Sequence, residues 1–386
     1  MQYIWQQPSW PNFKYDPKRL AGLTEEIRLL QGRLIGHADH LSHSESLSSQ
    51  IDTLVQEAIE TSAIEGESLN AASVRSSAAR RLGLDAAGMA SPTRESELIV
   101  QMLVEAVSNV TEPLTAADLF RWQASLFPER PLFMPNEAVI GGLRSDTEGH
   151  PMAVVSQQGY REVVHFVAPP SDVLERELAE FLHWFNEETG TDGLIRAGIA
   201  HLWLVTIHPF SDGNGRVTRA VCDRALAKDE KTSVRFYSMS AAIIRSRSRY
   251  YEILEMTQKG SIDVTDWLVW FLETLRDALQ RSLDRFLRTL AKTRFWRLHR
   301  NSELNDRQRK VLNRLLDAEP GEFEQGINAS KYKSIASTSK ATATRDLAEL
   351  VKLGCLAQMK GGGRSTRYAI ALKSQLYEVM TFGNND

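Results

Sequence analysis

Apolar residues recur at three- and four-residue spacing through most of this chain, which is the pattern of amphipathic α-helices. The clearest stripe runs from Pro17 to about Ile35, where a proline opens the first turn and leucines follow on one face. The same pattern predicts further helices at about 48–65, 95–107, 115–126, 174–187, 194–207, 217–228, 246–258 and 267–300. The sequence therefore predicts a mainly α-helical protein.

Two stretches in the N-terminal half leave the helical pattern. The segment 3–15 carries several tryptophan, phenylalanine and tyrosine side chains among its prolines, and so much aromatic surface favours burial. We interpret it as an extended strap on the main domain. The β-branched run from Glu162 to Val167, which ends before Pro169, predicts a short strand pair or hairpin.

The pattern changes again near residue 305. Helices at 306–316, 332–336 and 339–353 are followed by strands around a glycine tip at 361–363, an order that resembles a winged helix-turn-helix. Residues 328–373 hold nine Lys or Arg and two Asp or Glu, a charge of +7, which favours nucleic acid. Winged helices also serve as protein-docking or dimer modules, so DNA and protein both stay candidate partners.

Composition is that of an ordinary globular protein of 386 residues, 42% hydrophobic and 25% charged, long enough for two or three domains. The net charge of −3 argues against a protein that coats polyanions over its whole surface. Cys222 and Cys355 offer no disulfide framework and no zinc spacing, which is typical of a reducing cytosol. Without a signal-peptide pattern or a long apolar run, we expect a cytoplasmic protein with no membrane partner.

Candidate chemistry is concentrated in the stretch 208–219, His-Pro-Phe-Ser-Asp-Gly-Asn-Gly-Arg-Val-Thr-Arg, between two predicted helices. The loop leads into a helix N-terminus, where free backbone N–H groups and the helix dipole favour an anion. Gly213 and Gly215 allow the backbone to approach a ligand closely. Arg216 and Arg219 fall on one helix face and can bind phosphate oxygens.

Two further groups in this stretch could take part in a reaction. Asp212 offers an oxygen ligand of the kind that Mg²⁺ takes alongside phosphates, and His208 can accept a proton near neutral pH. An ordinary structural turn is the alternative, because short glycine motifs are common. The residues needed for a calcium loop or a P-loop are missing.

The twelve residues resemble the complete signature of the Fic family, His-x-Phe-x-Asp/Glu-Gly-Asn-Gly-Arg-x-x-Arg, at every fixed position. Fic proteins mostly transfer AMP from ATP to a protein hydroxyl. The resemblance implies that His208 deprotonates the target hydroxyl and that Asp212 holds Mg²⁺ against the α- and β-phosphates. It further implies an anion hole at Gly213, Asn214 and Gly215, a β-phosphate contact from Arg216 and a γ-phosphate contact from Arg219.

Residues 61–66, Thr-Ser-Ala-Ile-Glu-Gly, resemble the inhibitory motif of autoinhibited Fic proteins, Ser/Thr-x-x-x-Glu-Gly/Asn. The resemblance implies that Glu65 pairs with Arg219 and displaces the γ-phosphate, so that ATP binds unproductively. A helix-terminal glutamate in solvent is the alternative.

The predicted hairpin resembles the Fic flap, with its Gly-x-x-Arg start at 141–144 and its Pro-Pro end. The resemblance implies main-chain pairing between a target segment and the flap residues Val164, His165, Phe166 and Val167, a form of β-augmentation. An ordinary surface hairpin is the alternative. Tyr250 and Gln258 resemble the family's two base contacts, one of the adjacent tyrosines packing in the core and the other against adenine.

These inferences predict a mainly α protein, with a Fic helical core, a β-hairpin flap and a C-terminal winged helix-turn-helix domain. The predicted domains are the strap and inhibitory helix at 1–94, the catalytic core at 95–275, a helical connector at 276–304 and the winged helix at 305–386. The expected activity is AMP transfer to a Ser, Thr or Tyr hydroxyl of a target protein and of the chain itself. The alternatives are AMP removal and a DNA-binding regulator that senses nucleotide. A homodimer is a candidate assembly.

Overall fold

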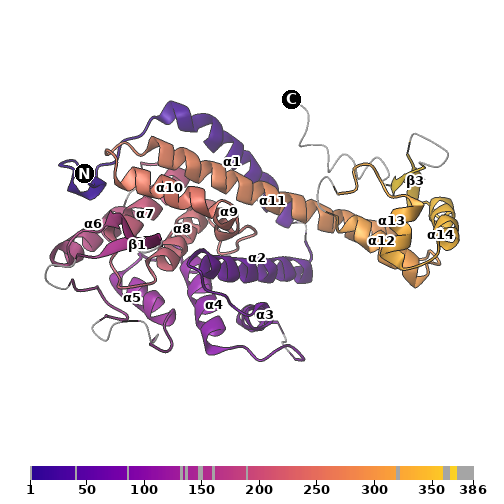
Figure 1. Cartoon of the computed structure of the whole chain (residues 1–386), viewed down its shortest axis with the longest axis horizontal. Coiled ribbons are helices and arrows are strands. Elements are labelled where there is room, and N and C mark those ends of the chain that lie inside the picture. Colours follow the sequence, from indigo (N-terminus) through magenta and orange to yellow (C-terminus); the bar gives the residue numbers. More distant parts are fainter. Residues whose placement is uncertain are drawn as a thin grey trace. The chain divides into compact units, whose positions relative to one another are not determined.

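The computed structural model describes residues 2–39, 41–84, 87–130, 134, 138–146, 151–158, 161–187, 190–318, 322–359 and 366–371. The chain forms two compact units, Met1–Ser282 and Leu283–Asp386, and Figure 1 labels their elements. The four predicted domain ranges stay predictions. No helix among the described residues is both long enough and apolar enough to cross a membrane.

The first unit is helical apart from one hairpin, as the sequence predicts. The hairpin pairs β1 (Ala153–Gln158) with β2 (Arg161–Val167) in antiparallel fashion, and two short 3-10 helices are η1 (Ile4–Gln6) and η2 (Ser171–Val173). The α-helices are α1 Pro17–Ala38, α2 His43–Ile64, α3 Ala71–Arg81, α4 Arg94–Val107, α5 Ala116–Ser125, α6 Leu174–Glu187, α7 Gly193–Ile207, α8 Asn214–Glu230, α9 Met239–Arg245, α10 Arg247–Gln258 and α11 Thr265–Leu298.

Among the helices that differ from the sequence prediction are α2, α3 and α9, and no predicted helix covers α9. Helix α2 begins at His43, about five residues earlier than predicted, because Ser42 and Glu45 form a capping box that fixes its first turn. Helix α3 was not predicted, because its buried side consists mostly of serine and alanine and shows no apolar stripe.

The core of the first unit is built around α7, which is buried on nearly every face and packs against α8. The predicted strap lies against this core. Ile4 is fully buried, and Trp10 contacts Trp203 of α7 with ring centroids 6.2 Å apart. Trp5 Nε1 donates a hydrogen bond to the carbonyl of Val167 at the end of β2 (2.8 Å), so the strap also holds one end of the hairpin.

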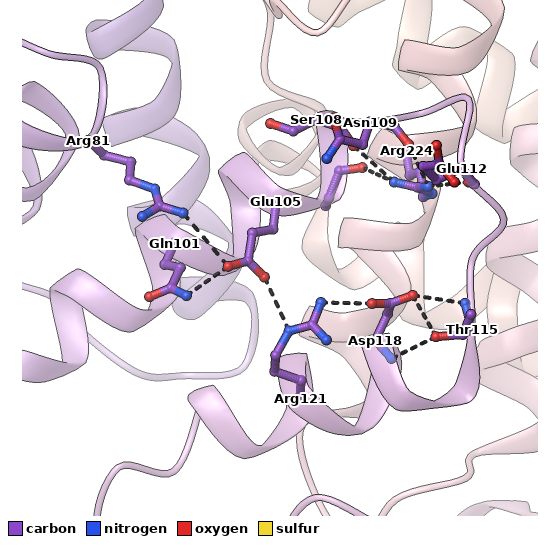
Figure 2. A network of polar contacts seen from close by, with 11 residues as sticks. Arg81, Gln101, Glu105, Ser108, Asn109, Glu112, Thr115, Asp118, Arg121 and Arg224 are labelled. Atoms are coloured by element: carbon purple, nitrogen blue, oxygen red, sulfur yellow. Dashed lines mark hydrogen bonds and ion pairs between the residues drawn. The ribbon is translucent and has the colours of Figure 1, made fainter.

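A polar network fixes α8 against the segment between α4 and α5 (Figure 2). The guanidinium of Arg224 donates to the carbonyl oxygens of Ala106, Ser108, Asn109 and Glu112. Next to it, Thr115 and Asp118 form a capping box at the start of α5. Because Arg224 is buried and its terminal nitrogens donate to main-chain carbonyls, the C-terminal half of α8 is anchored.

The described residues of the second unit form the C-terminal part of α11, three further helices and a two-stranded antiparallel sheet. The further elements are α12 Asp306–Leu316, α13 Ala329–Ala336, α14 Lys340–Lys352, β3 Leu356–Gln358 and β4 Tyr368–Ile370. Its core includes Val311, Tyr332, Leu347 and Leu350. The element order is the expected one, the glycine tip at 361–363 lies outside the described residues, and the winged helix stays a prediction.

Candidate functional site

His208 ends α7 in the left-handed conformation, with φ of 52°. Its Nδ1 lies 3.3 Å from the carbonyl oxygen of Val205 and donates to it in the neutral imidazole, so Nε2 keeps a free lone pair. The pKa of His208 is lowered to about 4, chiefly by burial and also by the charge of Arg144, while the hydrogen bond to Val205 and the charge of Glu65 oppose this shift. His208 is therefore a neutral base at physiological pH.

The loop after His208 turns sharply into α8. Gly213 has φ of 84°, and a β-carbon there would lie 2.9 Å from Cδ1 of Leu126, so both the backbone and the space require glycine. The side chain of Asn214 bonds to both main-chain groups of Phe210, at 2.9 and 2.8 Å. The side-chain amide of Asn214 therefore stabilises the loop. The groups available to bind an anion are the backbone N–H groups in the first turn of α8.

Asp212 is the candidate magnesium ligand and lies at the bend of the loop. Its carboxylate accepts a hydrogen bond from the N–H of Gly213 (2.5 Å), and its main-chain carbonyl accepts one from Gln123 (3.1 Å). The described residues contain no cluster of three or more His, Cys, Asp or Glu that could hold a metal by themselves. A partly exposed carboxylate beside an anion site suits Mg²⁺, which completes its shell with phosphate oxygens and water.

Arg219 and the predicted inhibitory Glu65 are in contact. Arg219 is 2% exposed, its Nη1 lies 2.8 Å from Glu65 Oε1, and its other nitrogens donate to the hydroxyl and carbonyl of Thr61. A β-carbon at Gly215 would collide with the same Glu65 oxygen. The carboxylate therefore lies directly against the N-terminus of α8, where an anionic ligand would bind.

A second glutamate, which the sequence analysis missed, pairs with the other arginine of the loop. Glu67 forms an ion pair with Arg216, which is 4% exposed and stands 5.4 Å from the centre of the Phe127 ring. Burial raises the pKa of Glu67, Arg216 opposes this, and the nearby carboxylates of Asp212, Glu95 and Glu65 add to it. The one signal in the sequence is a second acidic residue just after the glycine turn at Gly66.

A cavity of about 670 Å³ opens beside this loop, within the size range of small-molecule sites. Glu65, His208 and Gly215 line one part of it, and residues of the hairpin and of α10 line the rest. Gln258 lines it too but is buried, and donates to Thr206 (3.2 Å). The loop and the predicted base contacts thus belong to one cavity.

The two adjacent tyrosines of α10 differ in exposure. Tyr250 is 2% exposed and its hydroxyl lies 3.0 Å from Nε2 of His201, whereas Tyr251 is 37% exposed and donates to the carbonyl of Ile64 (3.2 Å). Both line the cavity, and Tyr251 offers more surface to a ligand. The base-binding roles of Tyr250 and Gln258 stay predictions.

The hairpin is tied to the loop through Arg144, whose role as an anchor the sequence did not show. Its Nε donates to the carbonyl of His208 (2.8 Å) and its Nη2 to that of Pro169 (2.5 Å). Phe166 of β2 is buried, His165 lines the cavity, and Val164 is 43% exposed. Target pairing by Val164, His165, Phe166 and Val167 stays a prediction.

Comparison with known proteins finds two family models that match parts of this chain. Residues 113–226 match the Fic/DOC family, and residues 3–84 match a domain of unknown function, DUF4172. "Protein adenylyltransferase fic-1" of Caenorhabditis briggsae is 34% identical over 95 residues, which are 24% of this chain and 17% of that protein. "Probable protein adenylyltransferase aq_aa38" of Aquifex aeolicus (strain VF5) is 30% identical over 103 residues, 27% of this chain and 30% of that one.

A crystal structure of a Fic family protein from Desulfovibrio desulfuricans G20 is similar in fold, with a TM-score of 0.52 and 18% identity over 94% of this chain and 98% of that one. The matches to the Caenorhabditis briggsae and Aquifex aeolicus proteins span less than a third of the length of either relative. On these matches, residues 113–226 of this chain form a Fic/DOC family domain.

Proposed function

We propose that this protein is an adenylyltransferase that moves AMP from ATP to a Ser, Thr or Tyr hydroxyl of a target protein and of itself. The observation that carries the proposal is the loop 208–219, which joins a neutral histidine base to a helix N-terminus with two buried arginines. The adenylyltransferase names of the relatives support it.

In the proposed reaction, His208 Nε2 takes the proton from the target hydroxyl, whose oxygen attacks the α-phosphorus of ATP, and pyrophosphate leaves. The N–H groups at the start of α8, with Arg216 and Arg219, stabilise the charge on the phosphates. Asp212 would hold Mg²⁺, which neutralises phosphate charge when bound.

We further propose that Glu65 inhibits this reaction. Its carboxylate lies against Gly215 and pairs with Arg219, so an ATP γ-phosphate would have to displace it. Glu67 holds Arg216 in the same way. Both arginines of the loop are thus paired to carboxylates from the turn after α2.

The test is transfer of label from [α-³²P]ATP in the presence of Mg²⁺, with wild type, Glu65→Gly and Glu65→Gly/His208→Ala. We expect labelled protein with the single variant, at least tenfold above wild type, and loss of label by a factor on the order of 10²–10⁴ in the double variant. Equal labelling in the single and double variants would remove the role of His208. Absence of label from all three would refute AMP transfer and favour AMP removal or another donor.

A second candidate function, DNA binding, is favoured by the surface of α14. The helix buries its apolar face, whereas Lys340, Thr344 and Arg345 near its start are exposed. Exposed cations and hydroxyls at the start of a helix are groups that contact phosphates and base edges. The check is fluorescence anisotropy of the full chain with duplex DNA at 50 and 200 mM salt, and unchanged affinity between the two would contradict it.

A further inference from the structure

Helix α2, whose C-cap is Glu65, is bonded to the start of α9 by the buried carboxylate of Glu57. Glu57 Oε2 accepts hydrogen bonds from the hydroxyl of Ser238 (2.6 Å) and from the main-chain N–H of Ser240 (3.2 Å). Glu57 Oε1 accepts a third hydrogen bond from the hydroxyl of Ser240. The Ser238 oxygen itself accepts from the N–H of Ala241 (3.0 Å), so its proton is free to point at Glu57. One carboxylate thus joins the two helices.

The face of α2 that carries Glu57 is buried but polar. Thr53, Glu57 and Thr61 follow at four-residue spacing, so they lie on one face, and all three are buried. The hydroxyl of Thr53 donates to the carbonyl of Ser49 within α2 itself (3.0 Å). A buried polar face packs stably only where its polar groups are hydrogen-bonded, because unpaired ones are costly. On this face, Glu57 and Thr61 make the hydrogen bonds that reach other elements.

The contacts of Thr61 and Glu65 are made with the candidate site itself. Arg219 donates to the hydroxyl of Thr61 (2.8 Å) and to its carbonyl (2.7 Å), and it pairs with Glu65 (2.8 Å). A phosphate that binds Arg219 would compete with these contacts. Glu57 lies about two turns before Glu65, and the described lining of the cavity includes neither Glu57 nor its two serine partners. Its hydrogen bonds to α9 can therefore persist while a nucleotide occupies the cavity.

We propose that Glu57 is a positioning residue of the inhibition, which holds α2 on α9 so that Glu65 stays against Arg219 when ATP competes for that arginine. This inference rests on the proposed inhibition by Glu65, and it names a residue that sets the strength of that inhibition. A ligand shifts an equilibrium only by its differential affinity for the two states, so a firmly held Glu65 is displaced less often. Weakening the bonds of Glu57 should therefore raise AMP transfer from outside the cavity.

The experiment is a double-mutant cycle in the labelling assay with [α-³²P]ATP and Mg²⁺. It compares initial rates of full-length wild type, Glu57→Ala, Glu65→Gly and the double variant. Glu57→Ala removes the acceptor of its hydrogen bonds to α9, so we expect transfer about tenfold above wild type. In the Glu65→Gly background the same change should alter transfer by less than about twofold, because the carboxylate that Glu57 positions is already gone.

Two further variants separate positioning from a general loss of stability. In Glu57→Gln the amide oxygen can accept from Ser238 and from the N–H of Ser240, and the amide NH₂ can donate to the Ser240 hydroxyl. We expect this conservative variant to transfer AMP within about twofold of wild type. Ser240→Ala removes one of the hydrogen bonds from the α9 side and should raise transfer about threefold, so it decides the question if Glu57→Ala does not fold.

The outcomes separate this inference from the proposed function. Label in Glu65→Gly without a rise in folded Glu57→Ala, or in Ser240→Ala where the former does not fold, overturns the inference and leaves AMP transfer intact. A rise of equal size with and without Glu65 also overturns it, since Glu57 would then act by another route. Equal rises in Glu57→Gln and Glu57→Ala overturn the role of the hydrogen bonds. If no variant is labelled, AMP transfer itself is refuted and the inference falls with it.

Discussion

Two helices in this protein carry a cluster of positive charge near their N-termini. The two clusters differ in burial and in ion pairing. At the start of α8, Arg216 and Arg219 are 4% and 2% exposed, and each is paired with a glutamate. At the start of α14, Lys340 and Arg345 are exposed and form no ion pair with another described residue. The first cluster fits the nucleotide phosphates of the proposed function, whereas the second fits the proposed contact with DNA.

The difference teaches that the proposed inhibition and the stability of the fold are linked in the first cluster. A buried charge without a partner is costly, so the two arginines need an anion whether or not a nucleotide is bound. Glu65 and Glu67 supply it when the loop is empty. The exposed cations of α14 are solvated and need no such substitute.

The largest effect should come from Arg219→Lys, which keeps the charge but loses the planar fork. Lysine cannot replace all three contacts that Arg219 makes with Thr61 and Glu65. Losing hydrogen bonds of a buried charged group should lower the free energy of unfolding by about 3 kcal/mol. Urea unfolding followed by circular dichroism measures it.

The matched control is Arg345→Lys on α14. An exposed substitution away from any network should change the free energy of unfolding by no more than about 0.5 kcal/mol. Equal losses of unfolding free energy in Arg219→Lys and Arg345→Lys would show that burial does not distinguish the two clusters.

A pH dependence of stability should come from two histidines, His201 within α7 and His208 at its end. The pKa of His208 is about 4 in the folded protein and roughly 6.5 in an unfolded chain, and that of His201 is about 3. Between these values the two histidines bind more protons in the unfolded chain, so their contribution to stability rises with pH and is lost as pH falls from about 6.5 to about 4. Asp223, whose pKa burial raises to about 7, contributes in the opposite sense over the same range.

Urea unfolding at pH 4.5, 5.5 and 7.0 measures this slope. His208→Asn should reduce it, since one of the two depressed groups is gone. Lysine and arginine do not titrate in this range, so Lys340→Ala should leave the slope unchanged. A slope in His208→Asn equal to that of wild type would refute the low pKa.

The signature loop was predictable because its candidate functional residues lie close together in the sequence. His208, Asp212 and Arg219 lie within twelve residues, and one helix start brings them together. Glu65 lies far from Arg219 in sequence, and only a resemblance pointed to their contact. The helices with clear apolar stripes were also predictable, and α6 has the bounds that its stripe predicts.

The contacts that could not be predicted depend on strand register and on turns. Glu67 meets Arg216 because Gly66 turns the chain after α2, and no spacing rule gives that partner. His165 meets Ser156 because of a bulge, which an alternating pattern of apolar residues does not reveal. These contacts are set by tertiary packing, so only the folded chain shows them.

A smaller effect is expected at α14, where Lys340→Ala/Arg345→Ala should weaken duplex DNA binding about tenfold at 50 mM salt. Each lost phosphate contact should also reduce the slope of log affinity against log salt by about 1. Fluorescence anisotropy across a salt series measures both. Glu349→Ala is the control, since it removes an exposed carboxylate from the same helix. An unchanged slope in the double variant would show that these cations do not meet phosphate.

The smallest effect should come from Glu67→Gln, which removes the charge that pairs with Arg216 and keeps the side-chain size. The side chain of Glu67 is 37% exposed and that of Glu65 is 29% exposed, so water screens the outer pair more than the inner one. We expect AMP transfer to rise about threefold, on the order of 0.7 kcal/mol, well below the rise in Glu65→Gly. Initial rates with labelled ATP measure it, with Glu129→Gln as the nearby control. A rise as large as that of Glu65→Gly would mean that the Glu67–Arg216 pair inhibits as strongly as the Glu65–Arg219 pair. Ion pairing, rather than depth of burial, would then be what keeps these arginines from binding the nucleotide.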